Sequence, residues 1–421
     1  MVETIQLAEG ITLRAVQTRK FKTGCFSVNF LRRHCRRDAA LDALLPSVLL
    51  RATQNYPDIS SISKHLDELY GASFGTLVRM KGEVKMTGFY ADFIEDAFLP
   101  DGEQVFAPML DFLQEVLYRP YTENACFLPR FVEGEKQNLI NTIEASQNDK
   151  RSYASLRLRQ LMCENEDYGV PRLGYAEDVA AITAQELWTH YQDVLRHSRI
   201  ELFYVGRRSA QEAAQMFSQV FAGRERGETV EIGTQVIRTA NAERTVMERM
   251  DITQGKLVIG LRTGITTQDS AFPALMLLNA VYGSGVTSKL FVNVREKLSL
   301  CYYAGSALEK YKGVMIVSSG IEFDKFEVAR DAILGELEAC RRGEITDEEL
   351  ESARRAILSA LRAALDAPAR LDDYYAGLAA AKGDTVEELY DKIAALDKSA
   401  LVDAARAIST DMIYFLKGVE A

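Results

Sequence analysis

Two residues with the chemistry to hold a peptide lie seven positions apart in the second half of the chain, Arg295 and Tyr302. A guanidinium is permanently charged and presents forked donors, and a phenol adds one neutral donor. Donors of this kind stabilise an oxyanion when they point at the place where its charge develops. On spacing alone, a solvated helix Arg and a half-buried strand Tyr are the commoner interpretation.

The segment 288–302 must position this pair. Its apolar residues recur at helical spacing: Leu290, Phe291, Val294 and Leu298. The spacing predicts a helix with these residues on its buried face. After Leu300, aromatic and β-branched residues with a turn at Gly313 predict two paired strands. We therefore expect Arg295 on a helix and Tyr302 at the start of a strand.

The string SKLFVNVREKLSLCYY, which begins at Ser288, resembles a known element, (S/T)-R-L-F-x-x-x-R-E-x-x-x-L-x-Y. The element belongs to the second domain of the pitrilysin/insulinase-type zinc peptidases and mitochondrial processing peptidases. In that family its Arg and Tyr hold the substrate backbone and the oxyanion beside a zinc ion. The resemblance implies that Arg295 and Tyr302 are substrate-binding residues.

The zinc motif of that family, HxxEH on the first helix of the first domain, is degenerate in this chain. The stretch NYPD from Asn55 resembles the KYP that follows the family motif, and it aligns Ala43 and Ser47 with the two His and Pro46 with the Glu. A methyl group cannot bind zinc, a hydroxyl is a poor ligand and proline has no carboxylate to activate water. We expect no metal, no other cofactor and no catalytic residue.

The third zinc ligand of the family falls near Asn141 or Thr142, and a shifted alignment leaves Glu135 and Glu144 as open alternatives for a ligand role. A lone carboxylate would make a weak site. The family's substrate-pairing edge strand usually carries Asn-Ala before a Thr, whereas 75–78 read GTLV in this chain. Peptide addition at this edge stays possible, because it needs only free backbone groups.

The remaining His residues suggest no relocated metal site, since no two of them have i,i+4 spacing. His190 and His197 are expected at the surface near a helix end. The basic run RRHCRR from Arg32 reads as a solvated loop, and Trp188 as core packing on a capped helix.

Length and composition bound the class of protein. A chain of 421 residues predicts two domains of about 200 residues. A formal net charge of -10 argues against nucleic acid as a partner. The N-terminus lacks a signal peptide and no apolar run approaches the roughly 18 residues of a membrane span, so we expect a cytoplasmic protein without a membrane partner. The six Cys show no regular spacing and are expected to be reduced.

The two halves repeat one order of elements. Lys81-Gly82 aligns with Lys312-Gly313 between paired strands. Capping boxes are expected at three helix starts: Thr183 with Glu186, Thr346 with Glu349, and Asp384 with Glu387. The repeat predicts an α+β fold of two homologous αβ sandwiches, each a mostly antiparallel sheet backed by helices. The expected domains are 1–222 and 245–421, joined by a linker at 223–244 into the clam-like pair that the family resemblance also implies.

Within this family the chain most resembles the non-catalytic bacterial members of the YfmF type, and the resemblance suggests a link to elongation-factor modification or peptide maturation. It implies an inactive homologue that is not an enzyme on its own. As partner of an HxxEH-bearing sister peptidase, it would supply Arg295 and Tyr302 to the cleavage of a peptide or unfolded polypeptide. The alternative is a structural or peptide-binding subunit without a part in catalysis, for which a homodimer is possible in isolation.

Overall fold

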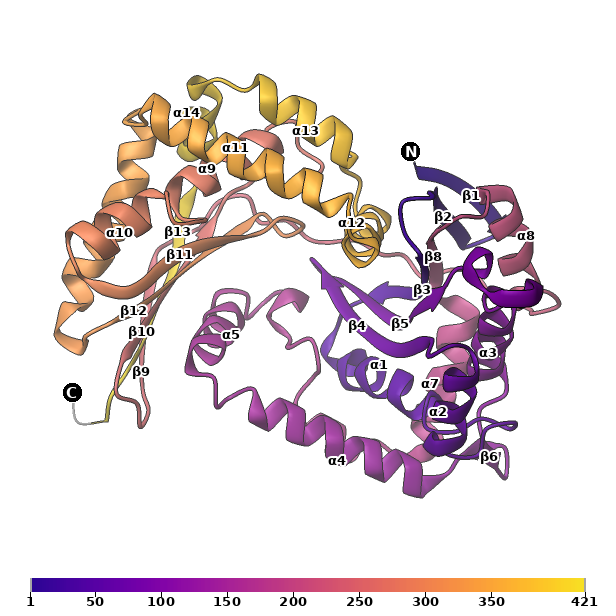
Figure 1. Cartoon of the computed structure of the whole chain (residues 1–421). Helices are drawn as coiled ribbons and strands as arrows, with labels where there is room; N and C mark the ends of the chain where they lie inside the picture. The colour runs from indigo at the N-terminus through magenta and orange to yellow at the C-terminus, as the bar shows by residue number, and fades with distance from the viewer. Residues whose placement is uncertain (1, 420–421) are drawn as a thin grey trace. The chain divides into compact units, whose positions relative to one another are not determined.

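The computed structural model describes residues 2–419 and divides into two compact units (Figure 1). Unit 1 consists of Met1–Glu144, Val170–Gly233 and Ala367–Ala380. Unit 2 consists of Ala145–Gly169, Thr234–Asp366 and Ala381–Ala421. Each unit therefore contains one segment from the opposite half of the sequence.

Unit 1 is built on a six-stranded sheet in the order β1-β2-β8-β3-β5-β4. Its strands are β1 (Val2–Ala8), β2 (Ile11–Gln17), β3 (Thr23–Arg33), β4 (Ser73–Lys81), β5 (Val84–Ile94) and β8 (Arg199–Gly206). Only β2 and β8 pair in parallel, and the other neighbours are antiparallel. The pairing leaves β4 at one edge of the sheet.

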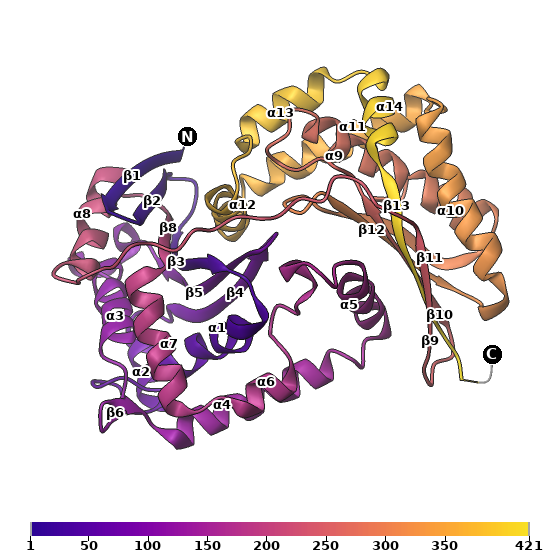
Figure 2. The same cartoon turned by 180° about the vertical axis from the view of Figure 1, so that it is seen from behind.

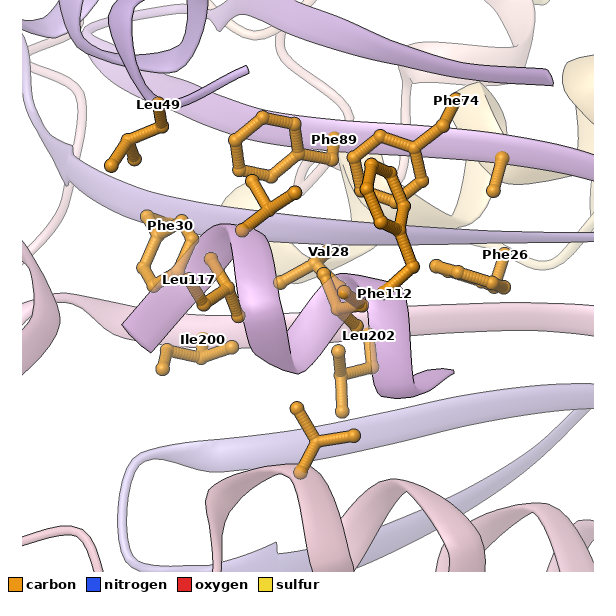
Figure 3. Close-up of a cluster of buried hydrophobic side chains, with 14 of the residues drawn as sticks. Phe26, Val28, Phe30, Leu49, Phe74, Phe89, Phe112, Leu117, Ile200 and Leu202 are labelled. Carbon is orange, nitrogen blue, oxygen red and sulfur yellow. The ribbon is translucent and has the colours of Figure 1, made fainter. Parts of the chain in front are cut away.

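The helical layer of unit 1 covers one face of this sheet. Its helices are α1 (Arg36–Leu49), α2 (Ile59–Glu68), α3 (Phe106–Tyr118), α4 (Pro129–Ala145), α6 (Ala176–Ala181), α7 (Ala184–His197) and α8 (Ala210–Phe221). Short elements complete the unit: β6 (Thr122–Glu123), β7 (Cys126–Phe127), η1 (Asp96–Phe98) and η2 (Pro100–Gly102). Figure 3 shows Phe112 and Leu117 of α3 among Val28 and Phe30 of β3, in the core that alternation along the strand creates.

Unit 2 is built on a five-stranded sheet in the order β11-β12-β10-β13-β9. Its strands are β9 (Arg244–Arg249), β10 (Gly255–Arg262), β11 (Cys301–Glu309), β12 (Val314–Ile321) and β13 (Ser409–Lys417). Its helices are α5 (Lys150–Met162), α9 (Phe272–Tyr282), α10 (Phe326–Arg341), α11 (Asp347–Ala364), α13 (Val386–Ala395) and α14 (Lys398–Ala407), with η3 (Asp167–Gly169), η4 (Leu290–Lys297) and η5 (Phe323–Lys325). Only β13 and β9 pair in parallel.

The sheet topology confirms the predicted repeat and the α+β class. Reading inward from β4, unit 1 has the order β4-β5-β3-β8-β2, and unit 2 has the matching order β11-β12-β10-β13-β9. The parallel pair falls at the same place in both sheets. The two aligned hairpin glycines, Gly82 and Gly313, have φ values of 64° and 69°. Both turns therefore use the left-handed conformation that glycine adopts without steric cost.

Unit 1 also contains α12 (Pro368–Ala380), which packs on β3 and β8 (Figure 2). Ser27 on β3 donates a hydrogen bond to Asp372, which is fully buried, and Arg79 lies 2.7 Å from the same carboxylate. Burial raises the pKa of the Asp372 carboxyl more than the nearby Arg79 guanidinium lowers it, so this pKa lies above its ordinary value. Tyr375 stacks on Phe203 of β8 with ring centroids 5.8 Å apart.

In unit 2, α5 occupies the equivalent place against β10 and β13. A Cβ at Gly260 would lie 2.5 Å from the Met162 sulfur, so α5 packs closely on β10 at this glycine and a larger residue would displace the Met162 side chain. Beyond the helix, Glu166 accepts from Arg262 at 2.7 Å and from Lys312 at 2.6 Å. These three side chains are almost completely buried, and the two cations lower the pKa of Glu166 against the effect of burial. The predicted domains, 1–222 and 245–421, were drawn from the sequence repeat, and their boundaries stay a prediction.

The expected linker has no helix or strand between 224 and 243, but it is bonded at both ends. Arg226 donates to the Leu195 carbonyl at 2.9 Å within unit 1. Within unit 2, Arg238 lies 3.1 Å from Asp269, and the Ala240 N–H donates to Ser409 at 3.0 Å.

Two of the three predicted helix starts need correction. The box at Thr346 with Glu349 is formed in both directions, as predicted. At Thr183 the side chain accepts from the Glu186 N–H, but the structure forms only this half of the box. The box predicted at Asp384 is wrong by one residue, because the Thr385 hydroxyl accepts from the N–H of Glu388 and begins α13. None of the helices within residues 2–419 is long and apolar enough to span a membrane.

Candidate functional site

The residues that align with the zinc motif lie in the middle of α1, where they pack in the core of unit 1. Ala43 is 5% exposed and Pro46 is buried inside the helix. Pro46 has no N–H to give to the helix, while its own carbonyl accepts from Leu50 at 3.1 Å. The cavity that Pro46 lines with Leu45 and Leu49 is apolar and measures only about 10 Å³. These residues do not fit a zinc ion, since they offer a methyl group, a saturated ring and, at Ser47, a hydroxyl.

The open alternatives for a third ligand lie on α4. Glu135 is 3.5 Å from Arg51 and accepts from Asn138 at 3.2 Å, so its carboxylate is held by neighbours of its own unit. Glu144 is exposed one residue before the end of the helix. Within residues 2–419, His, Cys, Asp and Glu form no group of three or more that could hold a metal ion. A ligand role for Glu135 or Glu144 stays untested.

Two sequence interpretations around α1 are wrong. His190 is buried, not at the surface, with Nε2 2.8 Å from Asp42 on α1. The basic run beginning at Arg32 is not a solvated loop, since Arg32 and His34 are buried at the end of β3. His34 Nε2 lies 3.0 Å from the Val170 carbonyl. Burial of these polar groups is stabilised by specific partners that lie far away in the sequence.

The structure agrees with the predictions for His197 and Trp188. His197 is partly exposed, 2.8 Å from Asp193 on the same helix. His65 stacks on Tyr56 with centroids 4.6 Å apart, and burial lowers its pKa. Trp188 packs edge-on against Phe127 at the border of the unit 1 core.

The substrate-pairing edge strand of the resemblance corresponds to β4, which is an edge strand as expected. The Val78 carbonyl accepts from Arg172 at 2.8 Å, so it points away from β5. Residues alternate along an antiparallel strand, and Thr76 therefore also turns its N–H and carbonyl outward. The outer edge of β4 keeps backbone groups that a further strand can use.

The predicted helix at 288–302 is η4, a π-helix that ends at Lys297. The Leu298 N–H reaches back five residues to the Asn293 carbonyl at 3.0 Å. Leu290 and Val294 are buried as predicted, whereas Leu298 is 55% exposed, so that part of the prediction is wrong. The π-helix ends before Leu298, and Ser299 then has a φ of 49°, in the left-handed region. The chain therefore turns before Leu298 can join the buried face.

Tyr302 lies at a β-bulge at the start of β11. Cys301 pairs with Ile321 and Tyr303 pairs with Gly320, so Tyr302 is the extra residue in the ladder. A bulge of this kind re-aims a side chain and frees backbone groups from the sheet. The side chain of Tyr302 is accordingly 62% exposed, and its carbonyl accepts from Arg295 Nε at 3.0 Å.

Arg295 lies on the helix as expected, and three contacts within this segment hold its guanidinium. Besides the bond to Tyr302, the group lies 4.5 Å from the centre of the Phe291 ring. Its Nη1 is 3.2 Å from Glu296. The Arg295 side chain is still 37% exposed, so a ligand can reach it from solvent.

Arg295 and Tyr302 line one open pocket of about 420 Å³ in unit 2. The sequence analysis did not find two charged residues that complete it, Glu322, which directly follows β12, and Lys325 at the end of η5. The hairpin register could have indicated them, because Cys301 pairs with Ile321. The pocket brings the two predicted residues together, while their role as substrate ligands stays a prediction.

Comparisons with known proteins place this chain in a family. A family model described as "Peptidase M16 inactive domain" matches residues 181–357. A Bacillus subtilis (strain 168) protein named "Probable inactive metalloprotease YmfF" is 33% identical over 417 residues, covering 98% of this chain and 96% of the relative. The chain belongs to the M16 peptidase family. This confirms the pitrilysin/insulinase-type resemblance of the sequence, with one correction, since the inactive relative is named YmfF and not YfmF.

Two further proteins resemble this chain. A solved structure titled "Crystal structure of a conserved protein from Enterococcus faecalis V583" has a TM-score of 0.90 and 32% identity, covering 100% of this chain and 99% of that one. A second Bacillus subtilis protein, "Uncharacterized zinc protease YmxG", is 22% identical over 204 residues, which is 48% of this chain and 49% of the relative. This M16 chain is an inactive metallopeptidase homologue, and the replacement of the zinc motif at Ala43, Pro46 and Ser47 stays a prediction.

Proposed function

We propose that this M16 chain is the non-catalytic partner of an HxxEH-bearing sister peptidase and supplies Arg295 and Tyr302 to peptide cleavage. The observation that carries the proposal is the pocket in unit 2, where the π-helix and the β-bulge place both residues at one opening. The loss of the zinc motif is complete, whereas the Arg and Tyr positions are both filled. Such a pattern fits a chain whose second half still works on substrate.

The chemistry proposed for the pair is electrostatic. Arg295 would hold a peptide carbonyl with its outward donors, and the Tyr302 hydroxyl would donate to the oxyanion that forms beside the sister's zinc ion. Preorganisation supports this role, because Phe291, Glu296 and the Tyr302 carbonyl already restrict the guanidinium. Zinc and the water that it activates belong to the sister in this proposal.

Bacillus subtilis (strain 168) has one relative that is named as a probable inactive metalloprotease and another that is named as a zinc protease. Two such relatives in one organism support the idea of a sister chain. A heterodimer and a peptide or unfolded polypeptide substrate are parts of the same proposal. A cytoplasmic location is a further part, supported by six cysteines, all within the described residues, that form no disulfide.

The direct test is Arg295→Ala in a mixture of this chain with its HxxEH-bearing sister. We expect the turnover of a peptide substrate to fall about 10- to 100-fold, because Arg295 supplies a charged hydrogen bond to a peptide carbonyl, and such a bond contributes roughly 1.5–3 kcal/mol. Arg355→Ala is the matched control, an exposed helix Arg bonded to Ser352 at 3.2 Å, and should leave turnover unchanged. Equal turnover for Arg295→Ala and the wild type, with both chains folded, would contradict the proposal.

A second candidate is a peptide-binding or structural subunit without a part in catalysis, and the free edge of β4 favours it. Under this function the chain binds unfolded polypeptide by strand addition. In the absence of a sister peptidase it would form a homodimer that binds in the same way. Thr76→Pro removes one outward N–H without removing a bond to β5. Loss of binding in this variant, together with an inert Arg295→Ala, would favour the second function over the first.

A further inference from the structure

The hairpin of β4 and β5 decides which backbone groups of β4 point outward. Lys81 pairs with Val84 around a two-residue turn, and the register runs without a shift along the whole of β4. A two-residue turn joins a hydrogen-bonded pair, and such pairs alternate with pairs whose N–H and carbonyl groups face away from each other. The outward groups of β4, which an added strand would use, therefore belong to Phe74, Thr76, Val78 and Met80.

One of these outward carbonyls is already occupied. Arg172, in the loop before α6, donates from Nη1 to the Val78 carbonyl at 2.8 Å. The N–H of an added strand would stand about 2.9 Å from the same carbonyl. Thr76 and Met80 flank Val78 on this edge, so a strand that pairs with both of them meets the guanidinium between them. Strand addition along the whole edge therefore requires that Arg172 leave its place.

The main chain that carries Arg172 is anchored in the core of unit 1. Its own carbonyl accepts a hydrogen bond from Nζ of Lys85 on β5, and Lys85 is fully buried. Two residues earlier, the Val170 carbonyl lies 3.0 Å from Nε2 of His34, which is also fully buried. Two buried side chains thus fix the loop from below, and the loop presents the Arg172 side chain to the edge of β4.

The Arg172 side chain is held less firmly than its main chain. Arg172 is exposed, and so is its bond to the Val78 carbonyl. A hydrogen bond in water contributes little net free energy, because water or another donor replaces either partner. The guanidinium therefore opposes an incoming strand but can be displaced by one, while the Lys85 bond, which goes to the main chain, stays in place.

We propose that Arg172 is an autoinhibitory cap on β4, and that an extended polypeptide which adds to this edge must displace its guanidinium from the Val78 carbonyl. The inference rests on strand addition at β4, the second function proposed above, and adds a regulation of that site. The cap favours partners long enough to pair on both sides of Val78, because their further hydrogen bonds compensate for the lost one.

The test measures the binding of a fluorescein-labelled nine-residue peptide of alternating Thr and Gln to the full chain. We expect Arg172→Ala to bind it about three- to tenfold more tightly than the wild type, since the peptide no longer competes with a hydrogen bond. Arg37→Ala is the matched control and should leave the affinity unchanged. It removes the same charge from unit 1, where Arg37 lies at the surface 3.1 Å from Asp38.

The double variant Arg172→Ala with Thr76→Pro tests where the gain arises. It should lose the gain, because proline removes the outward N–H next to the uncapped carbonyl. A gain that persists in the double variant would place the peptide elsewhere and overturn the proposal. Equal affinities of the wild type and Arg172→Ala, with both folded by circular dichroism, would also overturn it. So would an Arg172→Ala chain that only self-associates, since Arg172 would then guard the edge against a second copy.

Strand addition itself is judged by Thr76→Pro alone. If this variant binds the peptide as tightly as the wild type, or if neither the wild type nor Arg172→Ala binds it, strand addition fails and the cap with it. If Thr76→Pro weakens binding while Arg172→Ala changes nothing, strand addition stands and the cap fails. The part of Arg295 in peptide cleavage is decided separately by Arg295→Ala.

Discussion

Asp42 and His190 form a buried pair next to the lost zinc motif, and they show how this part of α1 serves stability. Burial by itself would raise the pKa of Asp42, but the hydrogen bond and charge of His190, with Lys85 and Arg32 nearby, lower it below the ordinary value. Lys85 is itself buried, and burial lowers its pKa to about 8. At neutral pH the Asp42 carboxyl is therefore ionised inside unit 1, near the buried Lys85.

Asp42→Asn should reduce the free energy of unfolding at pH 7 by roughly 1.5–3 kcal/mol, the range for a hydrogen bond to a charged group. A carboxylate with a lowered folded pKa stabilises above its unfolded pKa of about 3.9 and loses this contribution as pH falls toward the folded value. The difference between wild type and variant should therefore shrink below about pH 3.9. Urea unfolding from pH 3 to pH 7 measures it.

Asp178→Asn serves as the control for this prediction, because Asp178 pairs with Arg36 at the surface, 3.2 Å away. An exposed pair contributes roughly 0–1 kcal/mol. A pH-independent difference for Asp42→Asn would contradict the prediction, because it would show that folding does not lower the pKa of Asp42.

At the scale of elements, the hairpin between β11 and β12 carries the pocket, and its turn depends on Gly313. Replacing Gly313 with Ala should destabilise the chain by about 1–2 kcal/mol, because an L-residue is strained at a φ of 69°. Gly335→Ala should do the opposite. Gly335 lies within α10 and its added Cβ meets nothing within 4 Å, so a gain of about 0.5–1 kcal/mol is expected.

The measurement is the midpoint of thermal unfolding for both variants under one set of conditions. Opposite signs would establish that backbone conformation, and not the loss of glycine as such, decides the effect. Two losses of equal size would contradict the left-handed turn at Gly313.

At the scale of the whole molecule, each unit is completed by a helix from the other half of the sequence. A fragment of residues 234–421 lacks α5, and with it Arg157, Glu166 and the apolar side chains that approach Gly260. It would leave the buried Lys312 without the Glu166 carboxylate, while Arg262 would keep only Asp411, 2.7 Å away. Uncompensated buried charge typically costs about 3–5 kcal/mol.

We therefore expect this fragment to be poorly folded alone and to gain stability from an added peptide of residues 145–169. Thermal unfolding followed by circular dichroism measures the gain. A peptide with Arg157→Ala and Glu166→Gln is the control, since it loses the 2.6 Å pair with Glu248 and the partner of Lys312. A fragment that is equally stable with and without the peptide would show that α5 is dispensable for unit 2.

The sequence by itself determined the features that depend on local pattern. The repeat, the α+β class, the turn glycines Gly82 and Gly313, and the placement of Arg295 on a helix and Tyr302 on a strand all follow from periodicity and residue type. The replacement of the zinc motif at Ala43, Pro46 and Ser47 was also inferred from residue type, because the identity of a ligand does not depend on its surroundings, and it stays a prediction.

Tertiary structure alone decided which residues are buried and which backbone is irregular. His190 pairs with Asp42 across 148 positions of sequence, and no local pattern records such a partner. Leu298 obeys helical spacing, but the π-helix, Ser299 and the bulge at Tyr302 turn it to solvent. The helices α5 and α12 join their units through long-range packing, whose free energy is decided by contacts distant in the sequence.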